Sequence, residues 1–155
     1  MRIQDILERK GAKVITIAPS CSVQDAVRKL CEYHIGALVV VNEGGAPIGI
    51  VTERDIMMDC GYKCSQLEAL ADPEKESCPR FVKDIMTHEI VTGSLDDVLE
   101  DVMELMTLER VRHLPVIDHG TLAGLVSIGD VVHAHLVRTA AENASLKCYI
   151  SGTPS

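Results

Sequence analysis

The feature that most constrains this sequence is an internal repeat that spans nearly the whole chain. The tripeptide Val-Ile-Thr at 14–16 lies 76 positions before Ile-Val-Thr at 90–92, and the register continues without a gap for more than twenty residues. After a deletion of one residue the offset becomes 75, and the segment 49–55 falls on 124–130. Two copies of one pattern predict two copies of one supersecondary unit.

Each copy is predicted to form strand, helix, strand, strand, helix. Apolar residues at helical spacing follow Ser22, which is placed to cap a helix, and the second copy repeats this spacing. Short apolar runs at 37–41 and 114–117 precede hairpin turns, and final helices are expected to begin near Thr52 and Ser127. Because one copy of about 60 residues makes only a marginal core, we expect an α/β (α+β) fold of two β-α-β-β-α repeats packed through their sheets with pseudo-two-fold symmetry.

The repeat also predicts how the chain is divided. We expect a first repeat with an N-terminal helix over 1–60, a linker or insertion over 61–81, a second repeat over 82–140 and a C-terminal tail over 141–155. The linker is the least repetitive segment, which favours a surface position. The tail is expected to dock through its apolar residues and to fray at its end.

Charge and cysteine content exclude several classes of function. The net charge of -8 repels nucleic-acid phosphates and anionic lipid, so neither is an expected partner. The longest nearly apolar run, at 35–41, is too short to cross a membrane, and residues 1–10 lack the apolar stretch of a signal peptide. The six cysteines are therefore expected to remain thiols in a reducing cytoplasm.

A hydroxyl and a carboxylate stand three residues apart at the start of each final helix. They are Thr52 and Asp55 in the first copy, and Ser127 and Asp130 in the second. A carboxylate can accept hydrogen bonds from both ribose hydroxyls, while the Thr or Ser hydroxyl and the helix amides favour a phosphate. The alternative is a capping box with no ligand, and the duplication favours binding.

Four motifs, in order along the chain, resemble those of paired cystathionine-β-synthase-type (CBS) domains, together called a Bateman module. They are Gly-Ile-Val-Thr-Glu-Arg-Asp-Ile at 49–56, Val-Lys-Asp-Ile-Met-Thr at 82–87, Arg-His-Leu-Pro-Val at 112–116 and Gly-Leu-Val-Ser-Ile-Gly-Asp-Val-Val at 124–132. The resemblance covers nearly the whole chain. It implies a stand-alone regulatory module, not an enzyme, that binds adenosine-bearing ligands and forms a flat homodimer.

The resemblance also implies where such a ligand would lie. Strand ends in each copy would line a pocket whose apolar walls and backbone groups suit adenine. Arg112 and His113 resemble phosphate-side residues, whereas the first copy offers Arg54 where the second has Gly129, so the two sites are expected to prefer different numbers of phosphates. The expected binding residues are Thr16, Ala37, Leu38, Thr52, Arg54, Asp55, Thr92, Arg112, His113, Leu114, Pro115, Ser127 and Asp130.

The second copy departs from the family pattern at three positions. Gly93, Leu95 and Val98 stand where the family more often has an apolar residue, a proline and a threonine or serine. No cofactor is required on this interpretation. The expected ligand is AMP, ADP, ATP or another adenosyl compound, such as S-adenosylmethionine or a nicotinamide dinucleotide, and energy sensing through a change in conformation or partner affinity would follow.

Two non-catalytic alternatives remain open. The first is a structural, partner-binding module with vacant pockets, because Leu105 and Leu108 widen the apolar stripe of their helix and favour a dimer or partner face. The second is a thiol or metal sensor that uses Cys60, Cys64 and Cys78, although no fourth ligand is evident.

A catalytic alternative rests on a single turn. Val-Ser-Ile-Gly at 126–129 is similar to the nucleophile elbow of a hydrolase, in which the serine lies between a strand and a helix. The match fails at Leu125, where the strained turn requires glycine. The sequence therefore favours binding over catalysis.

Overall fold

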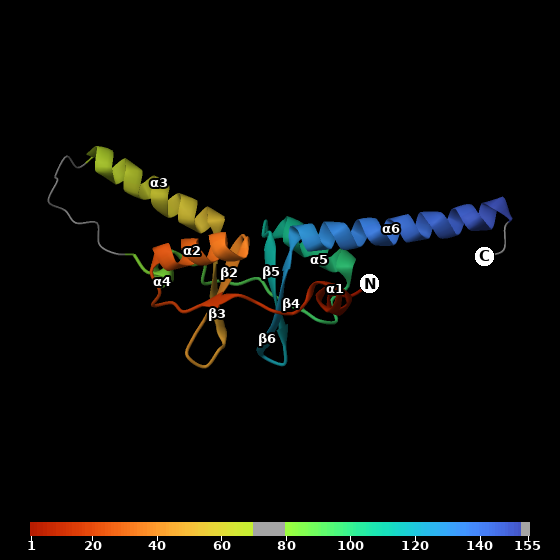
Figure 1. Cartoon of the computed structure of the whole chain (residues 1–155), viewed down its shortest axis with the longest axis horizontal. Helices are drawn as coiled ribbons and strands as arrows, with labels where there is room; N and C mark the ends of the chain where they lie inside the picture. The colour runs from red at the N-terminus through yellow and green to blue at the C-terminus, as the bar shows by residue number, and fades with distance from the viewer. Residues whose placement is uncertain (70–79, 153–155) are drawn as a thin grey trace. The chain divides into compact units, whose positions relative to one another are not determined.

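The computed structural model describes residues 1–69 and 80–152 of the chain, in which helices alternate with two three-stranded sheets (Figure 1). Most of the expected linker, residues 70–79, and residues 153–155 lie outside the described part. In chain order the elements are α1 (Ile3–Lys10), β1 (Thr16–Ile17), α2 (Val23–Tyr33), β2 (Ala37–Val41), β3 (Pro47–Thr52), α3 (Glu53–Ala69), α4 (Val82–Ile85), β4 (Gly93–Ser94), α5 (Leu99–Leu108), β5 (His113–Asp118), β6 (Thr121–Ser127) and α6 (Ile128–Ser151).

Both sheets have the same topology, with strand order β1-β2-β3 in one and β4-β5-β6 in the other. The first strand of each sheet pairs in parallel with the second, and the partners Ile17 and Val40 correspond in the repeat to the partners Gly93 and Val116. β2 and β3 then form an antiparallel hairpin. The mixed α/β fold with two equivalent sheets confirms the predicted fold class.

The repeat extends to an unusual backbone conformation. His34, after α2, has a φ of 53°, and Arg110, after α5 at the equivalent position, has a φ of 54°. Residues other than glycine rarely adopt this left-handed conformation, but the residue that follows a helix commonly does. The two copies therefore end their first long helix in the same way.

The chain folds into two compact units whose membership does not follow sequence order. The first-repeat unit contains Lys13–Ile90 and His119–Leu122, and the second-repeat unit contains Met1–Ala12, Val91–Asp118 and the chain from Ala123 on. The N-terminal helix α1 thus belongs to the unit built on the second repeat. The expected boundaries at 60 and 82 describe the sequence repeat and remain a prediction. Each repeat is preceded by a leading helix, α1 or α4, and each leading helix packs in the unit of the other repeat.

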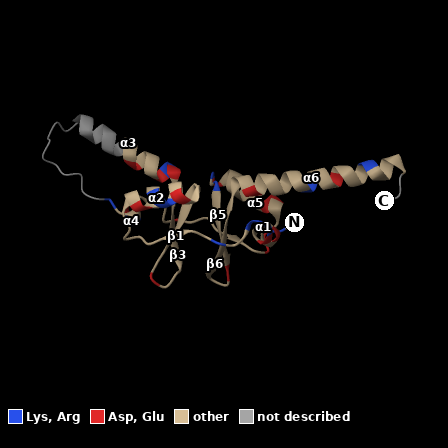
Figure 2. Cartoon of the chain, viewed as in Figure 1, with Lys and Arg blue, Asp and Glu red and all other residues tan. Residues whose placement is uncertain are grey.

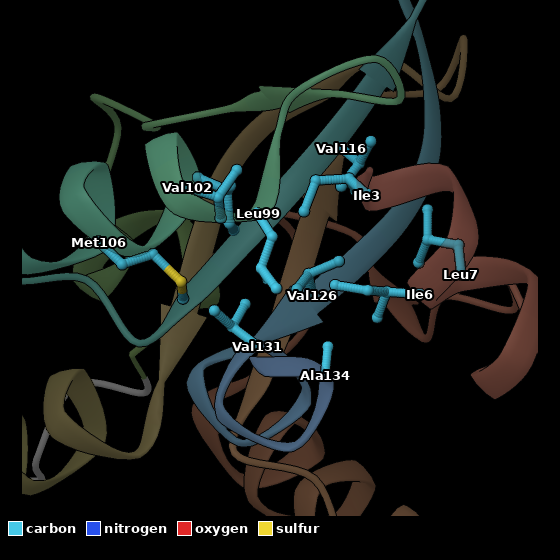
Figure 3. Close-up of a cluster of buried hydrophobic side chains, with 11 residues drawn as sticks. Ile3, Ile6, Leu7, Leu99, Val102, Met106, Val116, Val126, Val131 and Ala134 are labelled. Carbon is cyan, nitrogen blue, oxygen red and sulfur yellow. The ribbon is translucent and has the colours of Figure 1, made fainter. Parts of the chain in front are cut away.

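The core of the second-repeat unit is built around α1. Ile3, Ile6 and Leu7 are all at most 5% exposed and share one cluster with Val116 and Val126 of the sheet, and Figure 3 shows Ile3 beside Val116 and Ile6 beside Val126. The other buried members of this cluster come from α5, β5 and α6: Leu99, Val102, Met106, Leu114, Val131 and Ala134. The apolar face of α1 therefore completes this core.

The short helix α4 does the same for the first-repeat unit. Val82 is fully buried, and Ile85 and Met86 pack against the same core. The Val82 amide donates to the Cys21 carbonyl at 2.8 Å, which fixes the start of α4. The buried partners of Val82 are Ile17, Ala26, Leu30, Leu38, Val40 and Val51.

A glycine at the same repeat position lets each leading helix approach its sheet. A Cβ atom at Gly124 would lie 2.6 Å from Leu7 Cδ1, and one at Gly49 would lie 2.6 Å from Met86 Sδ. Leu7 and Met86 also correspond, because each ends a matching Asp-Ile-apolar triplet in its leading segment. Because these glycines have no side chain, α1 and α4 can each lie close to the sheet of the other repeat. We call α1 and α4 the crossed helices for this reason.

α6 is longer than the sequence analysis predicted. It continues through Ser151 and ends at Gly152, whose φ of 63° is the usual conformation after a helix. The segment expected to be a docked tail is thus helical through Ser151, and residues 140–151 are exposed. Within the described ranges, α6 included, no helix is both long enough and apolar enough to span a membrane.

Candidate functional site

The first predicted carboxylate lies where β3 passes into α3. The Thr52 amide and hydroxyl donate to Asp55 Oδ2 at 2.9 and 3.1 Å, and the Asp55 amide donates to Thr52 Oγ1 at 3.4 Å. The capping box considered from the sequence is therefore present. Asp55 Oδ1 accepts a longer hydrogen bond, 3.4 Å, from the hydroxyl of Thr87, which follows α4. These contacts fix a half-buried carboxylate at the strand-to-helix junction.

The second carboxylate lies at the equivalent junction between β6 and α6. The Ser127 amide and hydroxyl both donate to Asp130 Oδ2 at 2.8 Å. Lys10 Nζ, at the end of α1, donates to the same oxygen at 2.6 Å. No hydrogen bond among the described residues uses Asp130 Oδ1. The two junctions thus share their cap and differ in what the leading segment contributes, a hydroxyl from Thr87 or an ammonium group from Lys10.

Sequence reasoning missed both Thr87 and Lys10. Neither residue is near its carboxylate in the sequence, because Thr87 is 32 positions from Asp55 and Lys10 is 120 positions from Asp130. The only available signal was the weak match between the segments that contain them, and that match does not reveal which sheet each segment covers. The crossed packing of α1 and α4 brings these side chains to the junctions.

The ion pair of Asp130 sets its protonation. Burial raises the pKa of Asp130, but the hydrogen bonds from Lys10 and Ser127 and the charge of Lys10 outweigh burial and hold this pKa below its usual value. The side chains of Lys10 and Asp130 are 35% and 25% exposed, so solvent screens the pair only in part. The carboxylate is therefore ionised at neutral pH and already neutralised by a cation.

Replacing Lys10 with methionine is expected to lower the free energy of unfolding by about 1 kcal/mol at pH 7, as for a partly exposed ion pair. A depressed folded pKa contributes stability above the unfolded pKa of about 3.9 and loses it as the pH falls through the folded value. The difference between wild type and variant should therefore shrink below about pH 4. Urea unfolding at several pH values measures it.

The matched control is Lys13→Met, which removes the same charge from an exposed position. Its effect on the free energy of unfolding should be small at every pH. If Lys10→Met destabilised the protein equally at pH 7 and at pH 3.5, the ion pair would not be the source of the effect.

The other expected residues of the first repeat surround the Asp55 junction in part. Ala37 is the sheet partner of Thr52, and Thr16 lies half-buried in β1 with its carbonyl accepting a hydrogen bond from Lys29 Nζ at 2.8 Å. Arg54 is exposed on the first turn of α3. The side chain of Leu38 belongs to the hydrophobic core, which leaves only its backbone for the expected binding role.

Asp55 is also open to solvent on one side. Together with Met58, Asp59, Arg80 and Ile85 it lines a cavity of about 490 Å³ in the first-repeat unit. A volume of this order accommodates small ligands. The carboxylate that caps α3 is therefore accessible to a small molecule.

In the second repeat the expected residues are spread around the start of β5. Arg112 is exposed, and its carbonyl accepts a hydrogen bond from the Ile128 amide at 2.8 Å, which ties this strand to the start of α6. His113 is half-buried, Pro115 is buried, and Thr92 is exposed just before β4. Arg112 is thereby held next to the Ser127–Asp130 junction through its backbone.

Leu114, like Leu38, is a core residue. It is fully buried in the second-repeat unit, and a Cβ atom at Gly93 would lie 2.8 Å from Leu114 Cδ2. The leucine side chain therefore occupies the space that a larger residue at position 93 would need. This contact explains one of the three departures from the family pattern.

Several residues on which the alternative functions depend have structural roles, and others lie outside the described part of the chain. Ser127 is the cap of α6, with its hydroxyl bonded to Asp130. Leu105 packs partly against the core, and Leu108 is 71% exposed. Of the sensor cysteines Cys60 is exposed, whereas Cys78 and the side chain of Cys64 lie outside the described residues. The described residues of the chain contain no group of three or more His, Cys, Asp or Glu side chains that could hold a metal ion.

Comparison with known proteins places both repeats in one family. The family model described as "CBS domain" matches residues 3–60 and 82–136. The CBS domain-containing protein CBSX3, mitochondrial, of Arabidopsis thaliana is 35% identical over 158 residues, covering 97% of this chain and 72% of CBSX3.

Solved structures agree with this assignment. The CBS-domain-containing protein ATU1752 from Agrobacterium tumefaciens has a TM-score of 0.76 and 36% identity, with 86% of this chain and 92% of that one covered. A crystal structure of CBSX2 in complex with AMP has a TM-score of 0.69 and 28% identity, with 89% of this chain and 98% of that one covered.

Proposed function

The chain belongs to the CBS domain family, and on this premise we propose that it is a non-catalytic regulatory module that binds an adenosyl ligand at its two hydroxyl–carboxylate junctions. Binding would change its conformation or its affinity for a partner, as in energy sensing. The observation that carries the proposal is the duplication of the junction, because each repeat holds one half-buried carboxylate against a Thr or Ser hydroxyl at a helix start.

The chemistry of each junction fits an adenosine ligand. Each carboxylate is positioned to accept hydrogen bonds from the two ribose hydroxyls, and the adjacent helix start favours a phosphate. Arg54 would supply the positive charge that binds a phosphate in the first repeat, and Arg112 with His113 would do so in the second. The relative CBSX2 was solved with AMP, which makes AMP the first ligand to test.

The two junctions are expected to differ in affinity. A ligand at Asp55 replaces or joins a 3.4 Å hydrogen bond from Thr87, whereas a ligand at Asp130 must share its carboxylate with Lys10 at 2.6 Å. Separating an ion pair costs more than separating a neutral hydrogen bond. We infer that the Asp55 junction binds an uncharged ribose more tightly, while Lys10 adds a cation for phosphate at the Asp130 junction.

The remaining parts of the proposal concern assembly and location. We propose that the module acts as a homodimer in a reducing cytoplasm, where its thiols persist. The alternative is a structural, partner-binding module with vacant pockets, which the exposed Leu108 at the end of α5 favours. The ligand experiment below distinguishes these two functions.

The test is a thermal-shift and calorimetry panel with AMP, ADP, ATP, S-adenosylmethionine and NAD. A ligand present at 100 times its dissociation constant should add about 2.7 kcal/mol of stability, or roughly 5–10 °C. Because a hydrogen bond to a charged group contributes about 1.5–3 kcal/mol, Asp55→Ala or Asp130→Ala should weaken binding at its own junction roughly 30-fold.

The chain contains a matched control for the loss of the cap. Asp25 forms the same capping box with Ser22 at the start of α2, with its amide donating to Ser22 Oγ at 3.1 Å, and it is not an expected binding residue. Asp25→Ala should leave ligand affinity unchanged. No shift with any of the five compounds would favour the partner-binding alternative, and a shift unaffected by either junction variant would place the ligand elsewhere.

A further inference from the structure

The second half of α6 is a helix that nothing in the described chain covers. Every residue from Ala140 to Ser151 is exposed, and Figure 1 shows this half extending beyond α5. Isolated helices shorter than about 12–15 residues are marginal in water, and in proteins tertiary packing supplies most of the stability of a helix. A helix of this length is therefore expected to pack against a partner.

The composition of this stretch also differs from that of a solvated helix. Between Thr139 and Ser151 the only charged residues are Glu142 and Lys147, and Figure 2 shows most of this part of α6 without charge. Leu146, Tyr149 and Ile150 are 60%, 90% and 84% exposed. Exposed apolar side chains gathered on one stretch mark an interaction surface.

Six side chains along α6, five of them exposed and Thr139 half-buried, form a seam with coiled-coil spacing. Positions 132, 136, 139, 143, 146 and 150 alternate steps of four and three residues, which is the a/d pattern of heptads. Val132 and Leu136 in the first half of α6 are 46% and 61% exposed, so the seam remains accessible there too. The Thr139 hydroxyl donates to the His135 carbonyl at 2.9 Å, so its polar atom has a partner within the helix.

The polar residues of the seam point to a second copy of the same helix. With 136, 143 and 150 at a and 132, 139 and 146 at d, Asn143 is a single asparagine at an a position, a device that fixes the register of two parallel helices. Glu142 is then at g and Lys147 at e, five residues apart. In a parallel pair the g residue of one helix faces the following e residue of the other, so Glu142 meets Lys147 of the second copy.

We propose that α6 pairs in parallel with α6 of a second copy, as a two-stranded coiled coil through the seam from Val132 to Ile150. This inference rests on the homodimer included in the proposed function and gives it a specific surface. It does not depend on the ligand, because the seam contains none of the expected binding residues.

The first test measures the mass of the full chain by light scattering and sedimentation. The seam variant Leu146→Glu/Ile150→Glu places two charges at d and a, and the control Ser145→Glu/Cys148→Glu places the same charges at c and f on the outer face. None of these residues is buried in the cores, so far-UV circular dichroism should show a folded chain in both. Wild type and control should be dimers, and the seam variant should have a dissociation constant at least about 100-fold higher.

Two results would overturn the proposal, and they differ in meaning. A wild type that is a monomer at roughly 100 μM would remove both the homodimer and the seam. A seam variant that dimerises as tightly as the control would leave the homodimer standing and place its interface on another surface.

The second test fixes the orientation of the helices. In a parallel, in-register pair the two Asn143 side chains face each other, so Asn143→Cys should give a disulfide-linked dimer under mild oxidation. Ser145→Cys, at an outer position, should stay at the wild-type background set by the exposed native cysteines. Equal cross-linking of the two variants would contradict the parallel register.

Discussion

Replacing Ile3 with alanine is expected to lower the free energy of unfolding by about 3 kcal/mol and the melting temperature by roughly 6–12 °C. Ile3 is fully buried, and it packs in the cluster that includes Leu99 and Val126 of the second repeat. Truncating a buried isoleucine loses its transfer free energy and leaves a cavity that the surrounding residues fill only in part. Urea and thermal unfolding of the full chain measure the effect.

The control is Met57→Ala, because Met57 has a similar size and is 72% exposed. It should change the free energy of unfolding by less than about 0.5 kcal/mol. A change below about 1 kcal/mol for Ile3→Ala would mean that α1 does not belong to the core of the second repeat.

Arg80→Met is expected to lower the free energy of unfolding by about 3 kcal/mol, as for the loss of one partner of a buried ion pair. Asp59, on α3, is buried with 2% of its side chain exposed, and its Oδ1 lies 2.9 Å from Arg80 Nε. Removing the guanidinium takes its positive charge away from a buried carboxylate, which costs more than the intact pair contributes. Urea unfolding at neutral pH measures the difference.

The double variant Asp59→Leu/Arg80→Met separates the buried charge from the general loss of packing. It should recover most of the lost stability, because replacing a buried pair with apolar residues of similar volume is often neutral. If the double variant were as unstable as Arg80→Met alone, packing by Arg80 would be the cause.

The features predicted correctly are those that depend on nearby residues. The hairpins follow from apolar runs next to turn residues, and the caps at Ser22 and Ser127 follow from a hydroxyl placed before an apolar helical pattern. The duplicated junctions belong to this class, because Thr52 and Asp55 are three residues apart. Each of these patterns is complete within a few positions of the sequence.

The features that sequence reasoning missed depend on distant contacts. The apolar face of α1 shows that the helix packs on a sheet but does not specify which one, so the contact between Lys10 and Asp130 could not be predicted. Leu38 and Leu114 were expected to line a pocket because the family resemblance implied it, and this role remains a prediction for their backbone groups. Their side chains point into the two cores.

The extent of α6 was underestimated for a related reason. Beyond residue 140 the helix has no partner within the described chain, so the usual sign of a packed helix, burial along one stripe, is absent there. The four-and-three spacing of its exposed residues was present in the sequence, but a pattern of so few heptads is a weak signal by itself.

The crossed helices determine the order in which the chain can fold as it leaves the ribosome. The first-repeat unit has nearly all its residues by Ile90, including α4. The helix α1 emerges before either sheet, yet its partners on α6 lie as far as 120 positions later in the chain. During synthesis at about 5–20 residues per second, α1 therefore waits several seconds with its apolar face uncovered. While this chain is being made, α1 is thus expected to need protection for longer than the helices that follow it.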